Sequence, residues 1–169
     1  DGKSDINPGE AYNLVATAQH PKVLKYDFKD AEAARNLIDS IDTSMPCVIN
    51  ADLFDNHRFG MSPQQFVDMS ERLPNALISI GRKTDSGSID DFVDQFIQLA
   101  ADNPDKEFIM PAHIIDFLNN ITELRRVLDV PNISLMIYRT SDYKLTQGHL
   151  NWIKKHFDDQ LRSRTFFDL

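Results

Sequence analysis

The stretch ALISIGR, residues 76–82, has the composition of a buried β-strand that ends in a glycine and an arginine. Five other short runs have the same apolar, strand-like composition, and stretches with helical spacing separate them. They are Lys22–Phe28 (KVLKYDF), Cys47–Phe54 (CVINADLF), Glu107–His113 (EFIMPAH), Ile133–Arg139 (ISLMIYR) and Thr165–Leu169 (TFFDL). Their hydrophobicity is continuous rather than strictly alternating, which is typical of strands covered on both faces. The sequence therefore predicts six parallel strands in a chain of βα units.

Helix start signals separate these runs. The clearest is Ser88 followed by Asp91, a capping-box pattern ahead of apolar residues at helical spacing. The other expected helices follow Asp30, Ser62 with its capping partner Gln65, and Thr146, or span Asn7–Gln19 and Ile114–Leu128, the last broken near Asn119–Asn120. The side chains expected to face the core from the helices after Asp30 and Thr146 are Ala34, Leu37, Ile38, Ile41, Leu150, Ile153 and Phe157.

This organisation favours two architectures, an open doubly wound sheet or a TIM-type barrel. A dinucleotide-binding doubly wound fold has a glycine-rich turn after its first strand, whereas here Phe28 and Lys29 lead straight to the helix cap Asp30. Polar residues recur instead at the carboxyl ends of the strands, where parallel βα folds of either type place their ligand sites.

Composition excludes several classes of partner. The 169 residues are 41% hydrophobic and 26% charged, which is enough for one globular domain with a sizeable core. Lys and Arg total 18 against 26 Asp and Glu, so the net charge of −8 argues against nucleic acid and against an anionic membrane surface. The apolar runs are far shorter than the roughly 20 residues of a membrane span. The single cysteine, Cys47, excludes an intrachain disulfide framework.

Charged residues alternate along the first predicted strand. Lys25, Asp27 and Lys29 share one face, which in a barrel is the interior. If the strand is buried, these charges must pair with one another, with a metal or with a bound anion. If it is exposed, they are simply solvated. Both interpretations remain open from the sequence.

The following strands carry further candidates. Asn50 and Asp52 repeat the same geometry, and carboxylate oxygens such as those of Asp27 and Asp52 are ligands for Ca²⁺ or Mg²⁺, although a carboxylate at a strand end can equally cap a turn. The candidate phosphate- or ligand-binding residues are Lys25, Lys29, Asn50, Arg82, Tyr138 and Arg139. Lys29 and His113 are the candidate catalytic residues, and a lone histidine is also often structural. Asn120 and Asn132 begin N-glycosylation sequons, which are compatible with a secreted or extracellular protein.

Six blocks of the chain together resemble the menorin domain. They are LKYDFK (24–29), VINADLF (48–54), ALISIGRKT (76–84), FIMPAHI (108–114), SLMIYRT (134–140) and TFFDL (165–169). The resemblance covers residues 22–169 and implies a TIM-barrel fold of the phospholipase-C-like phosphodiesterase superfamily, related to glycerophosphodiester phosphodiesterases. Residues 1–21 are then an N-terminal helical segment outside that domain.

The resemblance also implies that this chain supplies strands three to eight of an eight-stranded barrel. Menorin-type proteins carry two earlier strands with a His-Ala pair, a Glu-x-Asp metal motif and a second histidine, none of which is found here. Asp27 resembles the metal ligand and Lys29 the phosphate-facing lysine of the third strand. Arg82, His113 and Tyr138 stand where the family usually has tryptophan, arginine and tryptophan.

Three functions are compatible with this pattern. The first is a non-catalytic extracellular recognition or scaffold module, whose partner is an extracellular or cell-surface protein or a companion N-terminal segment that completes the barrel. The resemblance supports it, because menorin-type proteins are implicated in cell-surface complexes that guide dendrite branching. The second is a divalent-metal-dependent phosphodiesterase that acts on glycerophosphodiesters or lysophospholipids once the missing segment is supplied. The third is a storage, venom or structural protein that keeps the scaffold alone.

Overall fold

A computed structural model describes residues 10, 13–15, 17, 23–42, 44, 46–54, 56–82, 87–140 and 143–168. Within these ranges six strands form one parallel sheet. The strands are β1 (Leu24–Phe28), β2 (Cys47–Phe54), β3 (Ala76–Arg82), β4 (Phe108–His113), β5 (Ile133–Tyr138) and β6 (Thr165–Asp168). All six predicted strands are confirmed. β4 begins after Glu107 and β5 ends before Arg139, while Lys22 and Leu169 lie outside the described residues.

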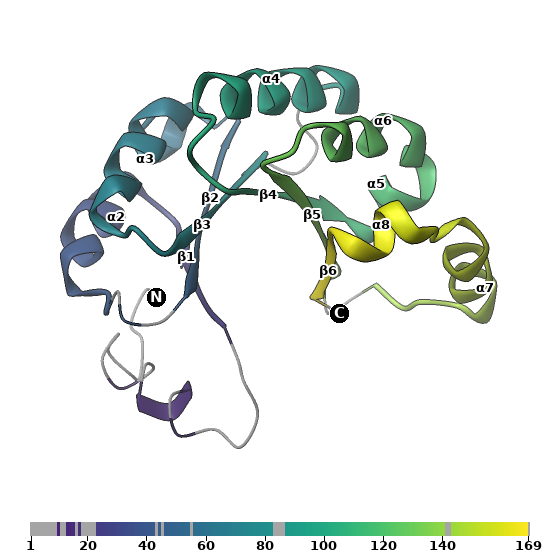
Figure 1. Cartoon of the computed structure of the whole chain (residues 1–169), viewed down its shortest axis with the longest axis horizontal. Helices are drawn as coiled ribbons and strands as arrows, with labels where there is room; N and C mark the ends of the chain where they lie inside the picture. Colours follow the sequence, from purple (N-terminus) through teal and green to yellow (C-terminus); the bar gives the residue numbers. More distant parts are fainter. Residues whose placement is uncertain are drawn as a thin grey trace.

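The order of the strands decides between the two expected architectures. The sheet runs β1-β2-β3-β4-β5-β6, without the reversal of order that defines a doubly wound sheet. Figure 1 shows the sheet curled inside an arc of helices, as in part of a TIM barrel. The TIM-barrel-like prediction is therefore confirmed at the level of a six-stranded half-barrel, with β1 and β6 as its two edges.

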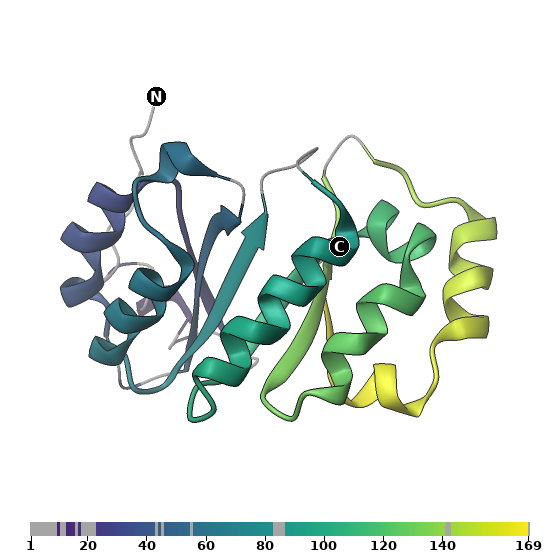
Figure 2. The same cartoon turned by 90° about the horizontal axis from the view of Figure 1, so that it is seen from above.

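The helices follow one another around the convex side of the sheet (Figures 1 and 2). They are α2 (Ala31–Leu37), α3 (Pro63–Met69), α4 (Ile89–Asp102), α5 (Ile114–Asn119), α6 (Ile121–Arg125), α7 (Gln147–His156) and α8 (Asp159–Ser163). Short 3₁₀ turns complete the connections, namely η1 (Ile38–Ser40), η2 (His57–Phe59), η3 (Ser70–Arg72) and η4 (Arg126–Asp129). Both ends of the helix predicted over Asn7–Gln19 lie outside the described residues. Within this range the described residues 10 and 13–15 are helical. No helix in the described ranges is long and apolar enough to cross a membrane.

The predicted helix caps form with one difference. Asp30 accepts a hydrogen bond from the Ala33 N–H, and Ser62 and Gln65 form the expected capping box. The chain breaks between α5 and α6 at Asn120, as predicted. Ser88 does cap α4, but its hydroxyl accepts from the N–H of Asp90, so the expected pairing with Asp91 is wrong.

The main core lies between the convex face of the sheet and the helices. Phe96 of α4 is fully buried there, with its ring edge-on to Phe92 and Phe108. Two core predictions are wrong, because Leu37 and Leu150 are exposed. Leu37 directly precedes the buried Ile38 and therefore points about 100° away from it around the helix axis.

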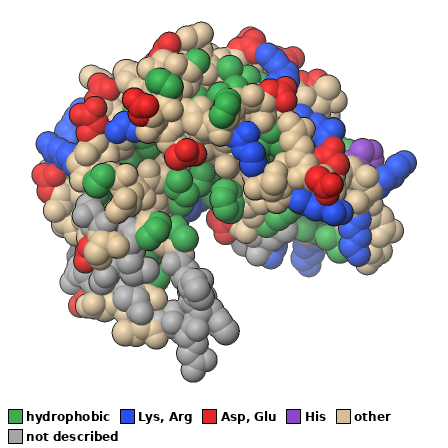
Figure 3. Space-filling model, in the orientation of Figure 1, with side chains coloured by type: hydrophobic (Ala, Val, Ile, Leu, Met, Phe, Trp, Pro, Cys, Tyr) green, Lys and Arg blue, Asp and Glu red, His purple; other side chains and the backbone are tan. Residues whose placement is uncertain are grey.

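The concave face of the sheet carries a second, smaller apolar cluster. Val48, Ile109 and Met136 are buried there, and Leu77 packs against them. Figure 3 shows hydrophobic side chains on the inner side of the arc, with charged side chains around its outer rim. Cys47 is a free, buried cysteine at the start of β2, and burial raises the pKa of its thiol.

Candidate functional site

A row of polar side chains crosses the first three strands on the concave face. Strand register places Asp27 beside Asn50 and Asn50 beside Ser79. The Asn50 amide donates a hydrogen bond to Asp27 Oδ1 at 2.8 Å, and the Ser79 hydroxyl donates to Asn50 Oδ1 at 2.7 Å. Lys29 Nζ donates to the other oxygen of Asp27 at 2.6 Å. Both carboxylate oxygens of Asp27 and the amide oxygen of Asn50 therefore accept a hydrogen bond from a neighbouring side chain.

The two lysines on and directly after β1 are paired with carboxylates and remain partly exposed. Lys29 pairs with Asp27, and Lys25 Nζ lies 3.6 Å from Asp168 Oδ2 of β6, at the opposite edge of the sheet. Because β1 is an edge strand, its flank is open, and Val23, which directly precedes it, is 57% exposed. The sequence left open whether these charges are buried and paired or exposed and solvated. In the structure they are paired and also partly exposed.

Asp52 differs from the other carboxylates of this face. Its side chain is half-buried on β2, and burial is the main reason that its pKa is raised. The charges of Lys29, Asp27 and Lys25 have smaller, opposing effects on that pKa. Among the residues that the structure describes, none forms a hydrogen bond or close ion pair with its carboxylate. Asp52 is therefore a charge that the fold itself does not compensate closely.

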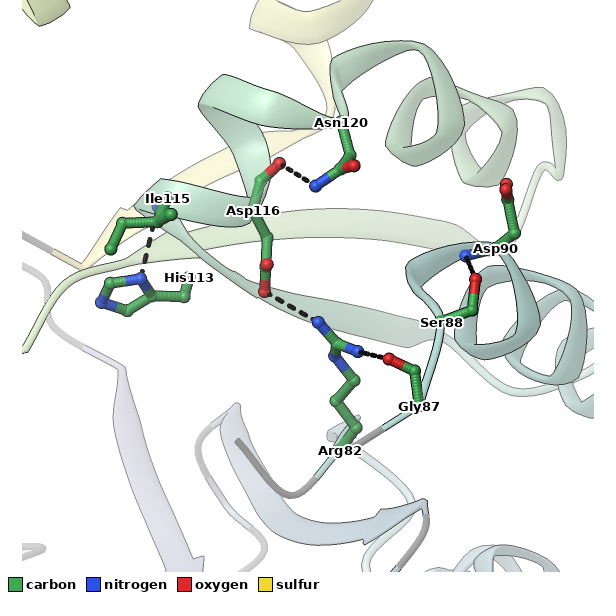
Figure 4. A network of polar contacts seen from close by, with 8 residues as sticks. All are labelled: Arg82, Gly87, Ser88, Asp90, His113, Ile115, Asp116 and Asn120. Atoms are coloured by element: carbon green, nitrogen blue, oxygen red, sulfur yellow. Dashed lines mark hydrogen bonds and ion pairs between the residues drawn. The ribbon is translucent and has the colours of Figure 1, made fainter. Parts of the chain in front are cut away.

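Arg82, at the end of β3, is held by several groups. Its guanidinium forms an ion pair with Asp116 of α5 at 3.3 Å and donates to the Gly87 carbonyl at 3.1 Å (Figure 4). It also lies 5.8 Å from the centre of the Phe92 ring. The side chain is only 16% exposed. Arg82 is therefore fixed in place by the fold itself.

His113 has structural partners on both ring nitrogens. Nδ1 accepts a hydrogen bond from the Ile115 N–H at 3.3 Å, which caps α5, and Nε2 lies 3.4 Å from the Thr140 hydroxyl. Its ring meets Tyr138 edge-on, with 5.4 Å between centres. The pKa of Tyr138 is raised, mainly by burial and further by the charge of Asp52.

These strand ends surround one cavity, which we call the rim hollow, with a volume of about 740 Å³. Its lining residues are Asp52, Gly81, Arg82, Gly87, Pro111, His113, Ile115, Asp116, Tyr138 and Thr140. Four predicted site residues, from β2, β3, β4 and β5, thus share this cavity. The volume lies in the range of natural small-ligand sites.

Other predicted residues lie elsewhere. Arg139 donates to the Tyr143 carbonyl and does not line the rim hollow. Asn120 donates to the backbone carbonyl of Asp116. The amide nitrogen of Asn132 donates to the carbonyls of Ala100, Asn103 and Lys106, so a glycan linked through that nitrogen has to displace these bonds.

Three contributors were missed at the sequence level, namely Ser79, Asp116 and Thr140. Ser79 had a detectable signal, because it lies two residues before Gly81 and so on the same face of a predicted strand. The structure pairs it in register with Asn50. Asp116 had none, since its role depends on where the first turn of α5 meets Arg82.

The polar row does not by itself fit a Ca²⁺ or Mg²⁺ site. Both oxygens of Asp27 already accept hydrogen bonds, from Asn50 and Lys29. The described ranges contain no group of three or more His, Cys, Asp or Glu side chains that could hold a metal ion. Ca²⁺ takes about six to eight oxygen ligands, most of them from the protein, and Asp27 and Asp52 are too few acceptors for it. Mg²⁺ keeps several waters and is held by one or two carboxylates together with substrate phosphates, so a Mg²⁺ site here would depend on a phosphate ligand that the protein itself does not supply.

Neither of two sequence comparisons places the chain in a family. No protein-family model matches it, and no curated protein is significantly similar to it.

Proposed function

We propose that this chain is a non-catalytic recognition or scaffold module of the menorin type, with a partial phospholipase-C-like phosphodiesterase barrel, that acts outside the cell. Its concave face binds a polypeptide segment that adds one or two strands to the open side of the sheet. The segment comes from an extracellular or cell-surface protein, or is a companion N-terminal segment.

The observation that carries this proposal is the pairing of Lys25 with Asp168 across the two edges of the sheet. Lysine and aspartate side chains reach about 6 Å and 3.5 Å from their Cα atoms, so these two Cα atoms are at most about 13 Å apart. Neighbouring strands are spaced by about 4.8 Å. With two strands inserted between β1 and β6 there are three such spacings, which add up to about 14 Å along the curved sheet and to less in a straight line. One or two strands therefore fit the opening.

The edges and the face between them are suited to such an addition. β1 and β6 each pair with one neighbour in the described sheet, which leaves a row of backbone donors and acceptors on the outer side of each. Phe166 of β6 lies in register with Met136 of the concave cluster and is 51% exposed. A segment bound here would cover that apolar surface as well as the backbone groups.

Amide hydrogen exchange on the isolated chain and on protein purified from its native source tests the proposal. In the isolated chain the amides of β1 and β6 should exchange faster than those of β3 and β4. In the native material they should be protected, and the mass of the particle should exceed that of one chain. Phe166→Glu should abolish both effects, whereas Arg72→Ala on the convex side should not. A native particle of single-chain mass with fast exchange at both edges would overturn the proposal.

One observation favours the metal-dependent phosphodiesterase as a second candidate. The structure brings Lys29 into contact with Asp27 and places Asp27 beside Asn50, at the strand ends where barrel enzymes bind substrates. On this alternative, the bound segment supplies the remaining metal ligands. Hydrolysis of glycerophosphodiesters or lysophospholipids with added Ca²⁺ or Mg²⁺ tests it, with Asp27→Ala as the inactive control. A native complex that hydrolyses neither class excludes it.

A further inference from the structure

The described ion pairs around the concave face do not include one of its carboxylates. Lys25 pairs with Asp168, Lys29 with Asp27, and Arg82 with Asp116. Each of these cations therefore has a carboxylate partner. Among the described residues of this face, the remaining carboxylate is Asp52, which is half-buried in the wall of the rim hollow. Burying part of a charge without a partner costs free energy, so this arrangement suits a site that receives its counter-charge from a ligand.

The glycine at position 81 makes room for that carboxylate. A Cβ atom at Gly81 would fall well inside the van der Waals radius of Asp52 Oδ1 and 3.4 Å from Pro111. Gly81 has no positive φ, so its backbone conformation does not require glycine. A glycine inside a strand weakens the strand and often marks a place where another group approaches closely. The group that approaches here is the Asp52 carboxylate itself, so the missing side chain makes room for this carboxylate in the wall of the rim hollow.

The other walls of the hollow are compatible with a cation that carries an apolar stem. Tyr138 and His113 present aromatic rings beside Pro111, which can cover methylene groups or lie against a charged group. Arg82 does not oppose a second cation strongly, because Asp116 neutralises it. A hard divalent metal fits less well, since it requires several oxygen ligands and Asp52 is the single uncommitted carboxylate among the described residues of the hollow.

We propose that the rim hollow binds a cationic side chain, arginine or lysine, of the segment that docks on the concave face, with its charged group against Asp52 and beside Gly81. This inference rests on the proposed function and names the chemistry of the partner at this point.

Titration of the ¹⁵N-labelled chain with single amino-acid probes tests the site without the partner. N-acetyl-arginine amide and N-acetyl-lysine amide should give saturable shifts of the Gly81 and His113 amide signals. N-acetyl-citrulline amide has nearly the shape of the arginine probe without its charge and should bind about tenfold more weakly or not at all. Asp52→Asn, which keeps the side-chain shape, should weaken the cationic probes by about tenfold. Gly81→Ala should also weaken them, because the added Cβ would displace the Asp52 carboxylate.

Asp39→Asn is the matched control, because Asp39 is an exposed carboxylate paired with Arg72 outside the hollow. It should leave the titrations unchanged. Equal affinity for the citrulline probe, or undiminished affinity in Asp52→Asn, would overturn the inference. So would shifts with Ca²⁺ or Mg²⁺ that depend on Asp52 when the cationic probes give none. Binding of the cationic probes by a chain with no native partner would leave the site standing and remove the proposed function instead.

Discussion

The two faces of the sheet differ in the side chains that they carry. On the convex side, Ile49, Ile78 and Leu135 belong to a large core of buried apolar side chains. On the concave side, the alternate positions of the same strands carry a small apolar cluster, a polar row and an uncompensated carboxylate. The convex face therefore provides most of the stability. The concave face keeps features that cost stability, which is what a binding surface does.

The largest expected effect is on the convex side, from Phe96→Ala. Phe96 is fully buried and contacts the rings of Phe54, Phe92 and Phe108, so truncation leaves a cavity that rigid neighbours cannot fill. Urea unfolding should show a loss of about 3–5 kcal/mol. A loss below about 1 kcal/mol, with an unchanged dependence on urea, would mean that this face does not hold the fold together.

A smaller loss is expected from breaking the polar row with Asn50→Ala. The buried Ser79 hydroxyl then loses its acceptor and Asp27 loses a donor, which should cost about 1–3 kcal/mol. In the double variant with Ser79→Ala the cost should be less than the sum of the two single losses, because no unpaired hydroxyl remains. Strict additivity in this double-mutant cycle would show that the two side chains are not coupled.

The convex face was largely predictable from the sequence because the signals that form it lie within short stretches of the chain. Six apolar runs, the capping residues Asp30, Ser62 and Thr146, and the break at Asn120 all appear in the structure. The errors are also local, since the flank of an amphipathic helix is hard to place by spacing alone. Leu37 lies on such a flank.

For the concave face, the sequence predicted which residues belong to the site but not which of them contact one another. The sequence identified Lys25, Asp27 and Asp52 as site residues, but it could not tell which charges meet. The contact of Lys25 with Asp168 depends on the curl of the whole sheet, and that of Arg82 with Asp116 depends on the docking of α5. The isolation of Asp52 follows from these pairings and was therefore invisible in the sequence.

Leu77→Ala should sharpen the contrast between the faces. Leu77 packs against the concave cluster but is only partly buried, so its loss removes less surface from protein contact than a core truncation does. We expect a cost of about 1 kcal/mol in urea unfolding of the isolated chain. A loss as large as that of Phe96→Ala would show that the concave face contributes equally to stability. That result would remove the difference between the two faces.

The smallest expected change has the opposite sign and comes from Asp52→Asn. Burial raises the pKa of Asp52 in the folded chain, so its ionised form is less favourable there than in the unfolded chain. Above that raised pKa the charge lowers stability, and as pH falls through it the folded protein takes up the proton first and the cost disappears. The variant should therefore be more stable than the wild type at pH 7, and the gap should close as the pH approaches the ordinary carboxyl pKa of about 3.9. Urea unfolding of both proteins across this pH range measures the gap. Asp27→Asn is the matched comparison, and it should lower stability because Asp27 already has Lys29 and Asn50 as partners. A loss of stability in Asp52→Asn at pH 7 would mean that this carboxylate is compensated within the fold.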